Sequence, residues 1–396
     1  MADRRYLLGV LVYNGMGVVE RCLESAARIA GPNVDVVVYD DCSPAEGWSS
    51  AVKEMCTVLS IGYYRSPRNI GIPRNMNLVM KSGVELGYDV VGLINSDVVL
   101  PANLIAAMDT VFDSASDIAS ITPWSNNVSV FSLPMGDAMA ALSDVRFVDR
   151  LSSALAALDG GRTVDIPTGV GYCMMIDVRS IASVGLMDPI FGRGYCEEVD
   201  WCQRAVLAGQ RHVLALSAYV FHEGGGTNRD EGLLAHGNTT VAEHEAIIRL
   251  RYPDYVDRVE RFLGSSNLAE LGRMELGRVF TALAQSNGYC LQIGSGIGSN
   301  DQVIVALPPN DPRGPAVLSL NGVKTSVELG SEFEWDEHTV LEKFGRPTSV
   351  VALEPGTVRK AFVDYAVREG TPLEQQMLYP FGIVRRVPGV VDLIGP

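Results

Sequence analysis

The first 220 or so residues alternate apolar runs rich in β-branched side chains with segments of helical periodicity. This alternation is typical of βαβ units and predicts a mostly parallel sheet with helices on both faces. The apolar runs predict strands at Tyr6–Tyr13, Val34–Asp40, Thr57–Tyr64, Asp89–Asn95 and Ile118–Thr122. We expect helices to fill the segments between them.

Two of these helices have recognisable starts. One should begin near Ile72, and Pro101 suits the first turn of another, because the N–H that proline lacks would have no partner there. From Trp124 to Thr163 the periodicity weakens into loop and one alanine-rich helix. We interpret this stretch as an insert between sheet elements, in the position of a lid or specificity element.

The pattern changes again after residue 263. The segment His236–Leu263 is charged and helical, and from Asn287 onward short apolar runs alternate with Pro and Gly turns. We therefore predict an α/β domain over residues 1–263 and a smaller mixed, β-rich domain over residues 264–396. The second domain is the expected place for homo-oligomer contacts or for help in holding a substrate.

Charge and cysteine content limit the classes of partner and location. A formal net charge of −15 argues against attachment to nucleic acid or anionic lipid by electrostatics, since both reward surplus Lys and Arg. Seven cysteines without a C-x-x-C pair favour a reducing compartment. The first residues make a poor signal peptide, and no run approaches the ~18 apolar residues of a membrane span. We expect a cytoplasmic protein without a transmembrane segment.

Polar side chains stand at the carboxyl ends of three predicted strands: Tyr13-Asn14, Asp40-Asp41 and Asn95-Ser96-Asp97. In open α/β sheets ligands bind beyond these ends, so the three groups should converge on one crevice. Asp97 could hold a hard divalent cation through oxygen and leave other coordination positions to phosphate and water. Capping of the following helix is the alternative role for this side chain.

A histidine, His222, ends the apolar run in "AYVFHEGGGTN" and precedes three glycines. Glycines let backbone N–H groups approach an anion, so this histidine is a candidate contact for a metal or a diphosphate. A buried core histidine would give the same local pattern.

The segment "GRGYCEEVDWCQRA" places Glu197, Glu198 and Asp200 within four positions, among apolar neighbours. If a helix begins at Glu197, then Glu198 shares a face with Cys202 and points inward, whereas Asp200 faces Arg204 at the i,i+4 spacing of an ion pair. Burial raises the pKa of a carboxyl group and a nearby cation lowers it. A carboxylate balanced in this way can accept a proton from a hydroxyl group.

Seven segments stand in a characteristic order: "LVYNG", "VVVYDDCSP", "RNIGIPRNMN", "INSDVVLP", "PTGVGYCMMIDVRSIASVGLMDP", "FGRGYCEEVDWCQRAVLAGQRHV" and "AYVFHEGGGT". This series resembles the inverting glycosyltransferases of family 2, which have the GT-A fold, a Rossmann-like sheet with helices on both faces. The resemblance covers about residues 6–228, and the Glu-Glu-x-Asp-x-Cys-x-Arg run is its most specific part.

The resemblance implies a nucleoside-diphosphate-sugar donor and a Mn²⁺ or Mg²⁺ cofactor. Asp40, with Asp41 beside it, matches the position that holds the nucleotide base, and Tyr13 would stack nearby. In the N-x-G-x-x-R-N stretch that starts at Asn69, Arg74 matches a residue that faces the nucleotide or its phosphates.

The same resemblance assigns the metal and the base. Asn95-Ser96-Asp97 matches the D-x-D metal motif, so Ser96 would lie at the donor, and His222 matches the histidine that reaches the metal or diphosphate. Glu198 matches the catalytic base, with Glu197 and Asp200 orienting the acceptor or the helix. Two positions depart from the family: Asn95 replaces the first acid of D-x-D, and Glu198 is one methylene longer than the usual Asp.

The resemblance implies hexosyl or deoxyhexosyl transfer to a hydroxyl acceptor on a glycan, a glycolipid or another molecule. A nucleic acid acceptor would leave the same motifs in place. A catalytically inactive GT-A scaffold that binds sugar nucleotides is an alternative that Asn95 and Glu198 favour. A sugar-phosphate nucleotidyltransferase is another, but "VYNGMGVVE" lacks the basic residue that its phosphate loop needs. The glycines of "LQIGSGIGSN" fit a tight turn better than a dinucleotide site, because Ser299 replaces the last glycine.

Overall fold

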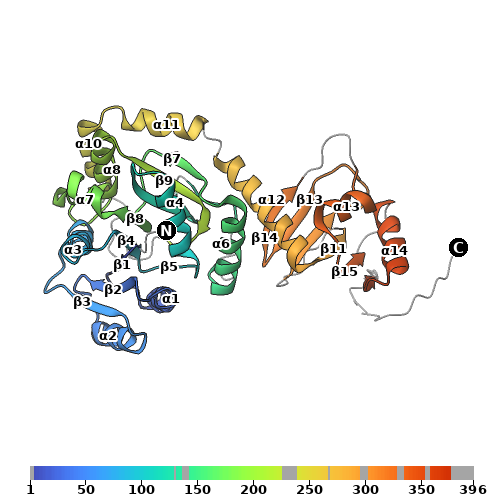
Figure 1. Cartoon of the computed structure of the whole chain (residues 1–396), viewed down its shortest axis with the longest axis horizontal. Coiled ribbons are helices and arrows are strands. Elements are labelled where there is room, and N and C mark those ends of the chain that lie inside the picture. Colours follow the sequence, from blue (N-terminus) through green and yellow to red (C-terminus); the bar gives the residue numbers. More distant parts are fainter. Residues whose placement is uncertain are drawn as a thin grey trace. The chain divides into compact units, whose positions relative to one another are not determined.

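The computed structural model describes residues 4–128, 131–135, 142–224, 239–265, 268–294, 302–327, 334–352 and 357–375. Contacts divide the chain into two compact units, residues 1–133 with 143–269, and residues 134–142 with 270–396. Each unit has its own sheet (Figure 1). The predicted division between residues 263 and 264 stays a prediction.

The first unit is built on an eight-stranded sheet of order β3-β2-β1-β4-β8-β6-β9-β7. Its strands are β1 Tyr6–Val12, β2 Val34–Asp40, β3 Gly62–Arg65, β4 Val90–Asn95, β6 Ile118–Trp124, β7 Thr163–Ile166, β8 Cys173–Asp177 and β9 Arg211–Tyr219. Strands β1 to β4 pair in parallel, as do β6 and β9, whereas β8 runs antiparallel to β4 and β6. The predicted mostly parallel sheet is confirmed.

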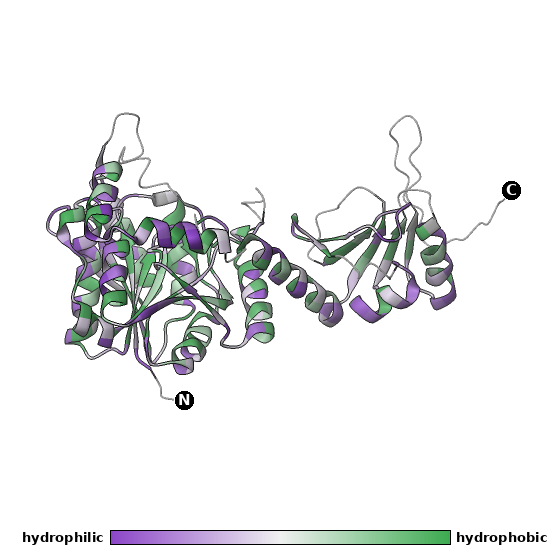
Figure 2. Ribbon diagram, turned by 90° about the horizontal axis from the view of Figure 1, so that it is seen from above, coloured by the Kyte–Doolittle hydropathy of each residue, from purple (hydrophilic) through white to green (hydrophobic). Residues whose placement is uncertain are grey.

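Helices cover both faces of this sheet (Figure 1). The helices are α1 Met16–Ala27, α2 Trp48–Val58, α3 Ile72–Glu85, α4 Leu104–Ser114, α6 Val145–Asp159, α7 Val178–Val184 and α8 Glu197–Leu207. Helices α1, α2 and α4 share one apolar core, which includes Cys22 and Trp48. Helices α3, α7 and α8 share a second core, which includes Met76 and Trp201. In Figure 2 the strands are coloured mainly as hydrophobic, in agreement with burial on both faces.

The strand predicted at Thr57–Tyr64 is partly wrong. Helix α2 continues through Val58, and the Thr57 hydroxyl donates to the Lys53 carbonyl at 2.9 Å, a bond within the helix. Strand β3 begins only at Gly62, after a turn in which Ser60 has a φ of 57°. The apolar residues before this turn follow the four-residue spacing of a helix, as the burial of Val52 and Cys56 shows.

The two predicted helix starts have different outcomes. Helix α3 begins at Ile72 as expected, with Pro73 in its first turn. Pro101 lies ahead of its helix, because α4 begins at Leu104, whose N–H donates to the Pro101 carbonyl at 3.1 Å in a preceding turn. The alanine-rich helix of the predicted insert is α6.

Short elements complete the first unit. Strands β5 (Val98–Val99) and β10 (Phe221–His222) pair antiparallel. The short helix η1 (Pro189–Phe191) precedes α8, and α10 (Thr240–Arg251) and α11 (Tyr255–Ser265) follow β10. None of the helices in the described part of the chain has an apolar stretch long enough to cross a bilayer.

The second unit contains a six-stranded mixed sheet of order β14-β13-β12-β11-β15-β16. Its elements are α12 Leu268–Asn287, β11 Tyr289–Ile293, β12 Val303–Leu307, β13 Ala316–Leu320, β14 Val323–Val327, α13 Glu337–Phe344, β15 Ser349–Ala352, α14 Thr357–Glu369 and β16 Leu373–Gln375. The ring of Phe344 contacts those of Tyr289 and Trp335, with ring centroids 5.8 Å apart in each pair. The expected smaller mixed, β-rich part is confirmed; Gly296 and Gly298 of the glycine turn lie outside the described residues.

Candidate active site

Polar residues from the carboxyl ends of β1, β2 and β4 meet in one cavity of about 340 Å³. Most of the expected site residues line it: Tyr13, Asp41, Asn69, Asn95, Ser96, Asp97, Glu197, Glu198 and His222. The parallel strands bring these ends to one edge of the sheet, as the topology requires. The lining does not include Asp40, Arg74 or Asp200.

Two of the lining residues, Asp97 and His222, contact each other. The pairing of β5 with β10 brings the His222 Nε2 atom to 3.4 Å from Asp97 Oδ1. The other imidazole nitrogen, Nδ1, donates to the Asn127 carbonyl at 2.9 Å. Burial opposes the charged imidazolium, but the Asp97 carboxylate and the Asn127 carbonyl outweigh it and raise the pKa of His222.

Two neighbours that the sequence analysis missed hold His222 in place. Asn126 pairs with the His222 backbone twice, accepting its N–H at 2.8 Å and donating to its carbonyl at 3.0 Å. The Tyr172 ring stacks on the imidazole, with centroids 5.1 Å apart. Tyr172 stands in a quoted motif, but its partner is distant in sequence, so no local signal could have shown the contact.

The pair Asp97 and His222 fits a divalent cation that is completed by substrate. Among the described residues, no group of three or more His, Cys, Asp or Glu side chains could hold a metal. Mg²⁺ and ions like it are usually bound through one or two protein groups together with phosphate oxygens and water. The hydrogen bond from Nδ1 to Asn127 fixes the tautomer that leaves Nε2 able to coordinate.

Glu197 and Glu198, in the first turn of α8, also line the cavity. Glu197 is 5% exposed, and the Oε2 atoms of both glutamates are buried without a hydrogen-bond partner among the described residues. Burial raises the pKa of both carboxyls, and the charge of Glu198 raises that of Glu197 further. These carboxylates are therefore ready to accept a proton or a hydrogen bond from a ligand.

The backbone just before α8 is strained. Tyr195 and Cys196 are left-handed, with φ of 70° and 73°, a conformation that costs non-glycine residues about 1–3 kcal/mol each. Such strain persists only where the surroundings determine the conformation, and it is concentrated at functional sites. The turn starts α8 so that its two glutamates line the cavity.

Asp41 and Asp40 have different surroundings. Asp41 lines the cavity and accepts the N–H groups of Ile70 and Gly71 at 2.8 and 2.9 Å, although burial raises the pKa of its carboxyl. Asp40 is fully buried and contacts four groups: the Ser43 N–H, the Ser49 and Tyr63 hydroxyls and the Arg65 guanidinium. The carboxylate of Asp40 thus fixes the loop after β2 and does not line the cavity.

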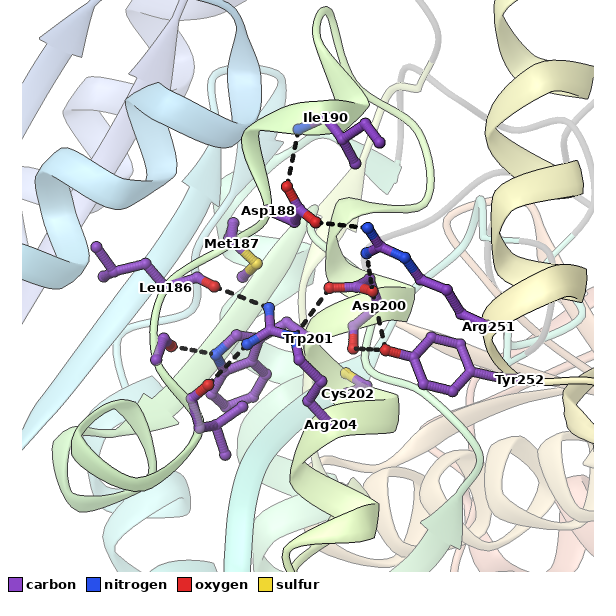
Figure 3. A network of polar contacts seen from close by, with 12 residues as sticks. Leu186, Met187, Asp188, Ile190, Asp200, Trp201, Cys202, Arg204, Arg251 and Tyr252 are labelled. Atoms are coloured by element: carbon purple, nitrogen blue, oxygen red, sulfur yellow. Dashed lines mark hydrogen bonds and ion pairs between the residues drawn. The ribbon is translucent and has the colours of Figure 1, made fainter.

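Two further candidates lie outside the cavity. Arg74 is exposed, and its guanidinium donates to the Ile70 carbonyl at 3.4 Å. Asp200 forms the ion pair with Arg204 that its spacing predicts, at 2.9 Å, and a second one with Arg251 at 2.7 Å (Figure 3). Asp200 therefore holds α8 in place.

The family model that matches residues 8–184 is described as Glycosyl transferase family 2. This part of the chain is a family 2 glycosyltransferase domain. The predicted resemblance is confirmed, and the reaction type of the family is sugar transfer from a nucleotide sugar. The matched residues include the cavity lining from Tyr13 to Tyr172, whereas Glu197, Glu198 and His222 lie beyond the family 2 match.

Three solved structures are similar to the chain. The first is GalNAc-T7 with UDP, GalNAc and Mn²⁺, at 14% identity and a TM-score of 0.43, and the match covers 55% of this chain and 44% of that chain. The second is the mannosyltransferase PcManGT from Pyrobaculum calidifontis with GDP-Man and Mn²⁺, at 16% identity and a TM-score of 0.45, and the match covers 74% of this chain and 76% of that chain. The third is S. aureus TarS 1-349, at 13% identity and a TM-score of 0.39, and the match covers 71% of this chain and 81% of that chain. The chain thus spans less than half of the GalNAc-T7 structure. It matches none of the curated proteins with which it was compared.

Proposed function

We propose that this chain is a metal-dependent inverting glycosyltransferase that moves a hexosyl or deoxyhexosyl group from a nucleoside diphosphate sugar to an acceptor hydroxyl. One observation carries the proposal. A single cavity is lined by a pair suited to a metal ion, Asp97 and His222, and by two glutamates, Glu197 and Glu198, whose Oε2 atoms are buried without a hydrogen-bond partner among the described residues. An inverting transferase needs a group that stabilises the leaving diphosphate and a base for the acceptor.

The donor would lie along the strand ends. Tyr13, Asp41 and Asn69 line the cavity from the ends of β1 and β2 and from the segment before α3, and we place the nucleotide there. Asn95 and Ser96, which line the cavity directly before Asp97 in the sequence, would contact the donor. Asp97 and His222 would hold Mn²⁺ or Mg²⁺ together with the diphosphate. When bound, the cation supplies positive charge against the negative charge that develops on the leaving group.

Glu198 would act as the base. The acceptor hydroxyl loses its proton to the Glu198 carboxylate while its oxygen forms a bond to the anomeric carbon. The bond from that carbon to the diphosphate oxygen breaks, and its electron pair leaves with the diphosphate. Attack opposite the leaving group inverts the anomeric centre. Glu197, whose carboxylate is also buried at the cavity, would accept a hydrogen bond from the acceptor.

Asp40, Arg74 and Asp200 have other roles in this proposal. Asp40 supports the loop that presents Asp41, and Asp200 anchors α8. Arg74 would contact phosphates only after turning away from the Ile70 carbonyl. As acceptor we propose a hydroxyl of a glycan or glycolipid, since a net charge of −15 gives little attraction for nucleic acid. A cytoplasmic location and a homo-oligomer formed through residues 264–396 complete the proposal.

The test is release of nucleoside diphosphate from a panel of UDP-, GDP- and dTDP-hexoses, with Mn²⁺, with Mg²⁺ and with EDTA. We expect one donor class to be consumed, slowly by hydrolysis without an acceptor, and only with metal. Pyrophosphate formation from a nucleoside triphosphate and a sugar 1-phosphate would instead indicate a nucleotidyltransferase. Nucleotide binding without any turnover would indicate the inactive scaffold.

A further inference from the structure

Helix α10 contacts both ends and the middle of the segment Asp188–Asp200, which carries Glu197 and Glu198. We propose that Arg251 and His244 of α10, with Tyr252 directly after it, are positioning residues that hold Glu198 in its reactive place. This inference rests on the proposed function and adds residues that the sequence motifs do not include.

Arg251 ties the two ends of the segment together. One guanidinium nitrogen, Nη2, lies 2.8 Å from Asp188 Oδ2, and the other, Nη1, lies 2.7 Å from Asp200 Oδ1 (Figure 3). The Tyr252 hydroxyl donates to the same Asp200 oxygen at 2.9 Å. A guanidinium presents donors in a rigid planar fork, which suits a bridge between two carboxylates better than the single point charge of lysine.

His244 fixes the middle of the segment. Its Nδ1 atom lies 2.8 Å from the Gly194 carbonyl oxygen, and because a carbonyl can only accept, Nδ1 carries the proton. The imidazole also meets the Phe191 ring edge to face, with centroids 5.4 Å apart. Gly194, whose carbonyl accepts this hydrogen bond, directly precedes the left-handed residues Tyr195 and Cys196.

An apolar cluster joins the same two elements. Phe191 packs with Ile248 and Tyr252 in a cluster distinct from the two cores of the sheet, and Cys196 and Val199 pack against it. The packing of the segment that leads into α8 therefore depends on α10. A strained turn needs such support, since its surroundings must determine its conformation.

The positioning residues lie apart from the donor site. Arg251 lines a separate surface hollow with Asp188, Asp200 and Tyr252, and neither Arg251 nor His244 is in the cavity lining. Loss of the bridge should therefore displace Glu198 without removing a donor contact. A displacement of about 1 Å can lower a rate by ~10²-fold.

The first test compares Arg251→Met with Arg251→Lys and with Arg249→Met, an α10 control whose arginine is 66% exposed and pairs with Glu245. We expect Arg251→Met to lower kcat about 10- to 100-fold and to leave the Kd for the nucleoside diphosphate within about 2-fold. Arg251→Lys should recover part of the loss, and Arg249→Met should match the wild type. An unchanged kcat in Arg251→Met, or an equal loss in Arg249→Met, overturns the proposal.

The second test does not depend on activity. Hydrogen exchange of the amides in residues 189–200 should become faster in Arg251→Met, with the exchange of β1 and β4 unchanged. His244→Phe keeps a ring against Phe191 but removes the hydrogen-bond donor, so it should give a smaller increase in the exchange rate of the same amides. If Arg251→Met does not fold, exchange in His244→Phe is the test of the positioning role. Unchanged exchange in this segment overturns the positioning role. Absence of transfer by the wild type with every donor refutes the proposed function instead.

Discussion

Replacement of Glu198 by glutamine keeps the size of the side chain and removes the base. General base catalysis typically contributes ~10² to 10⁴-fold in rate, which corresponds to about 2.7–5.5 kcal/mol of activation free energy. The Oε2 atom of Glu198 has no hydrogen-bond partner among the described residues, so the new amide breaks no bond that they make there. We therefore expect Glu198→Gln to fold and to bind nucleotide as the wild type does while kcat falls by at least ~100-fold.

The stability of the same variant gives a second, independent readout. Burial raises the pKa of Glu198 in the folded protein, so the unfolded chain ionises first as the pH rises, and ionisation destabilises the fold. The neutral glutamine lacks this penalty. Glu198→Gln should thus unfold at a higher temperature than the wild type at neutral pH, and the difference should disappear below the ordinary pKa of a glutamate.

The assay measures kcat with saturating donor and the thermal midpoint at acidic and neutral pH. Glu197→Gln tests the neighbouring carboxyl and should lower kcat less than Glu198→Gln does. Glu54→Gln, at an exposed site on α2, is the control and should change neither kcat nor the thermal midpoint. The base assignment is refuted if Glu198→Gln binds nucleotide and keeps more than about a tenth of wild-type turnover.

Two further predictions concern stability. Gly71 has a φ of 82°, and a Cβ there would lie 2.0 Å from the Gly192 carbonyl oxygen. Gly71→Ala should therefore lower the free energy of unfolding, measured in urea, by more than about 3 kcal/mol, whereas Gly87→Ala, with a φ of 70° and open space around it, should lower it by about 1–2 kcal/mol. Equal losses in the two variants would disprove the close approach of Gly71 to Gly192. Burial lowers the pKa of His212 to about 4, so the unfolded chain takes up this proton first and stability should fall by about 3 kcal/mol between pH 6.5 and pH 4. His212→Gln should flatten this part of the pH profile, and an unchanged slope would contradict the assignment.

The parts of the fold that the sequence predicts are those with a local cause. Strands β1 and β4 are continuous apolar runs because both faces of the sheet are covered there, and their polar ends follow directly. Strand β2 is interrupted by the exposed Asp35 but is otherwise apolar up to Asp40. The strand predicted from Thr57 is partly wrong because a short apolar run before a turn has the same composition in a helix and in a strand.

The site was predictable at the level of segments and less so at the level of side chains. Asp40 and Asp41 are adjacent in sequence, but after β2 only Asp41 lines the cavity, because the Asp40 carboxylate accepts hydrogen bonds within the following loop, such as that from the Ser43 N–H. Asn126, Tyr172 and Arg251 act through partners 50 or more residues away, so no periodicity or spacing indicates them.

The most direct test of the central claim is the thermal midpoint with UDP, dTDP, GDP and CMP, each with and without Mn²⁺. A ligand at ~100 times its Kd adds about 2.7 kcal/mol, which for a unit of this size raises the midpoint by about 5–10 °C. We predict such a rise with one nucleoside diphosphate, only with Mn²⁺, and its loss in Asp97→Asn. No rise with any of the four nucleotides, or an equal rise without metal, would contradict a metal-dependent nucleoside diphosphate site.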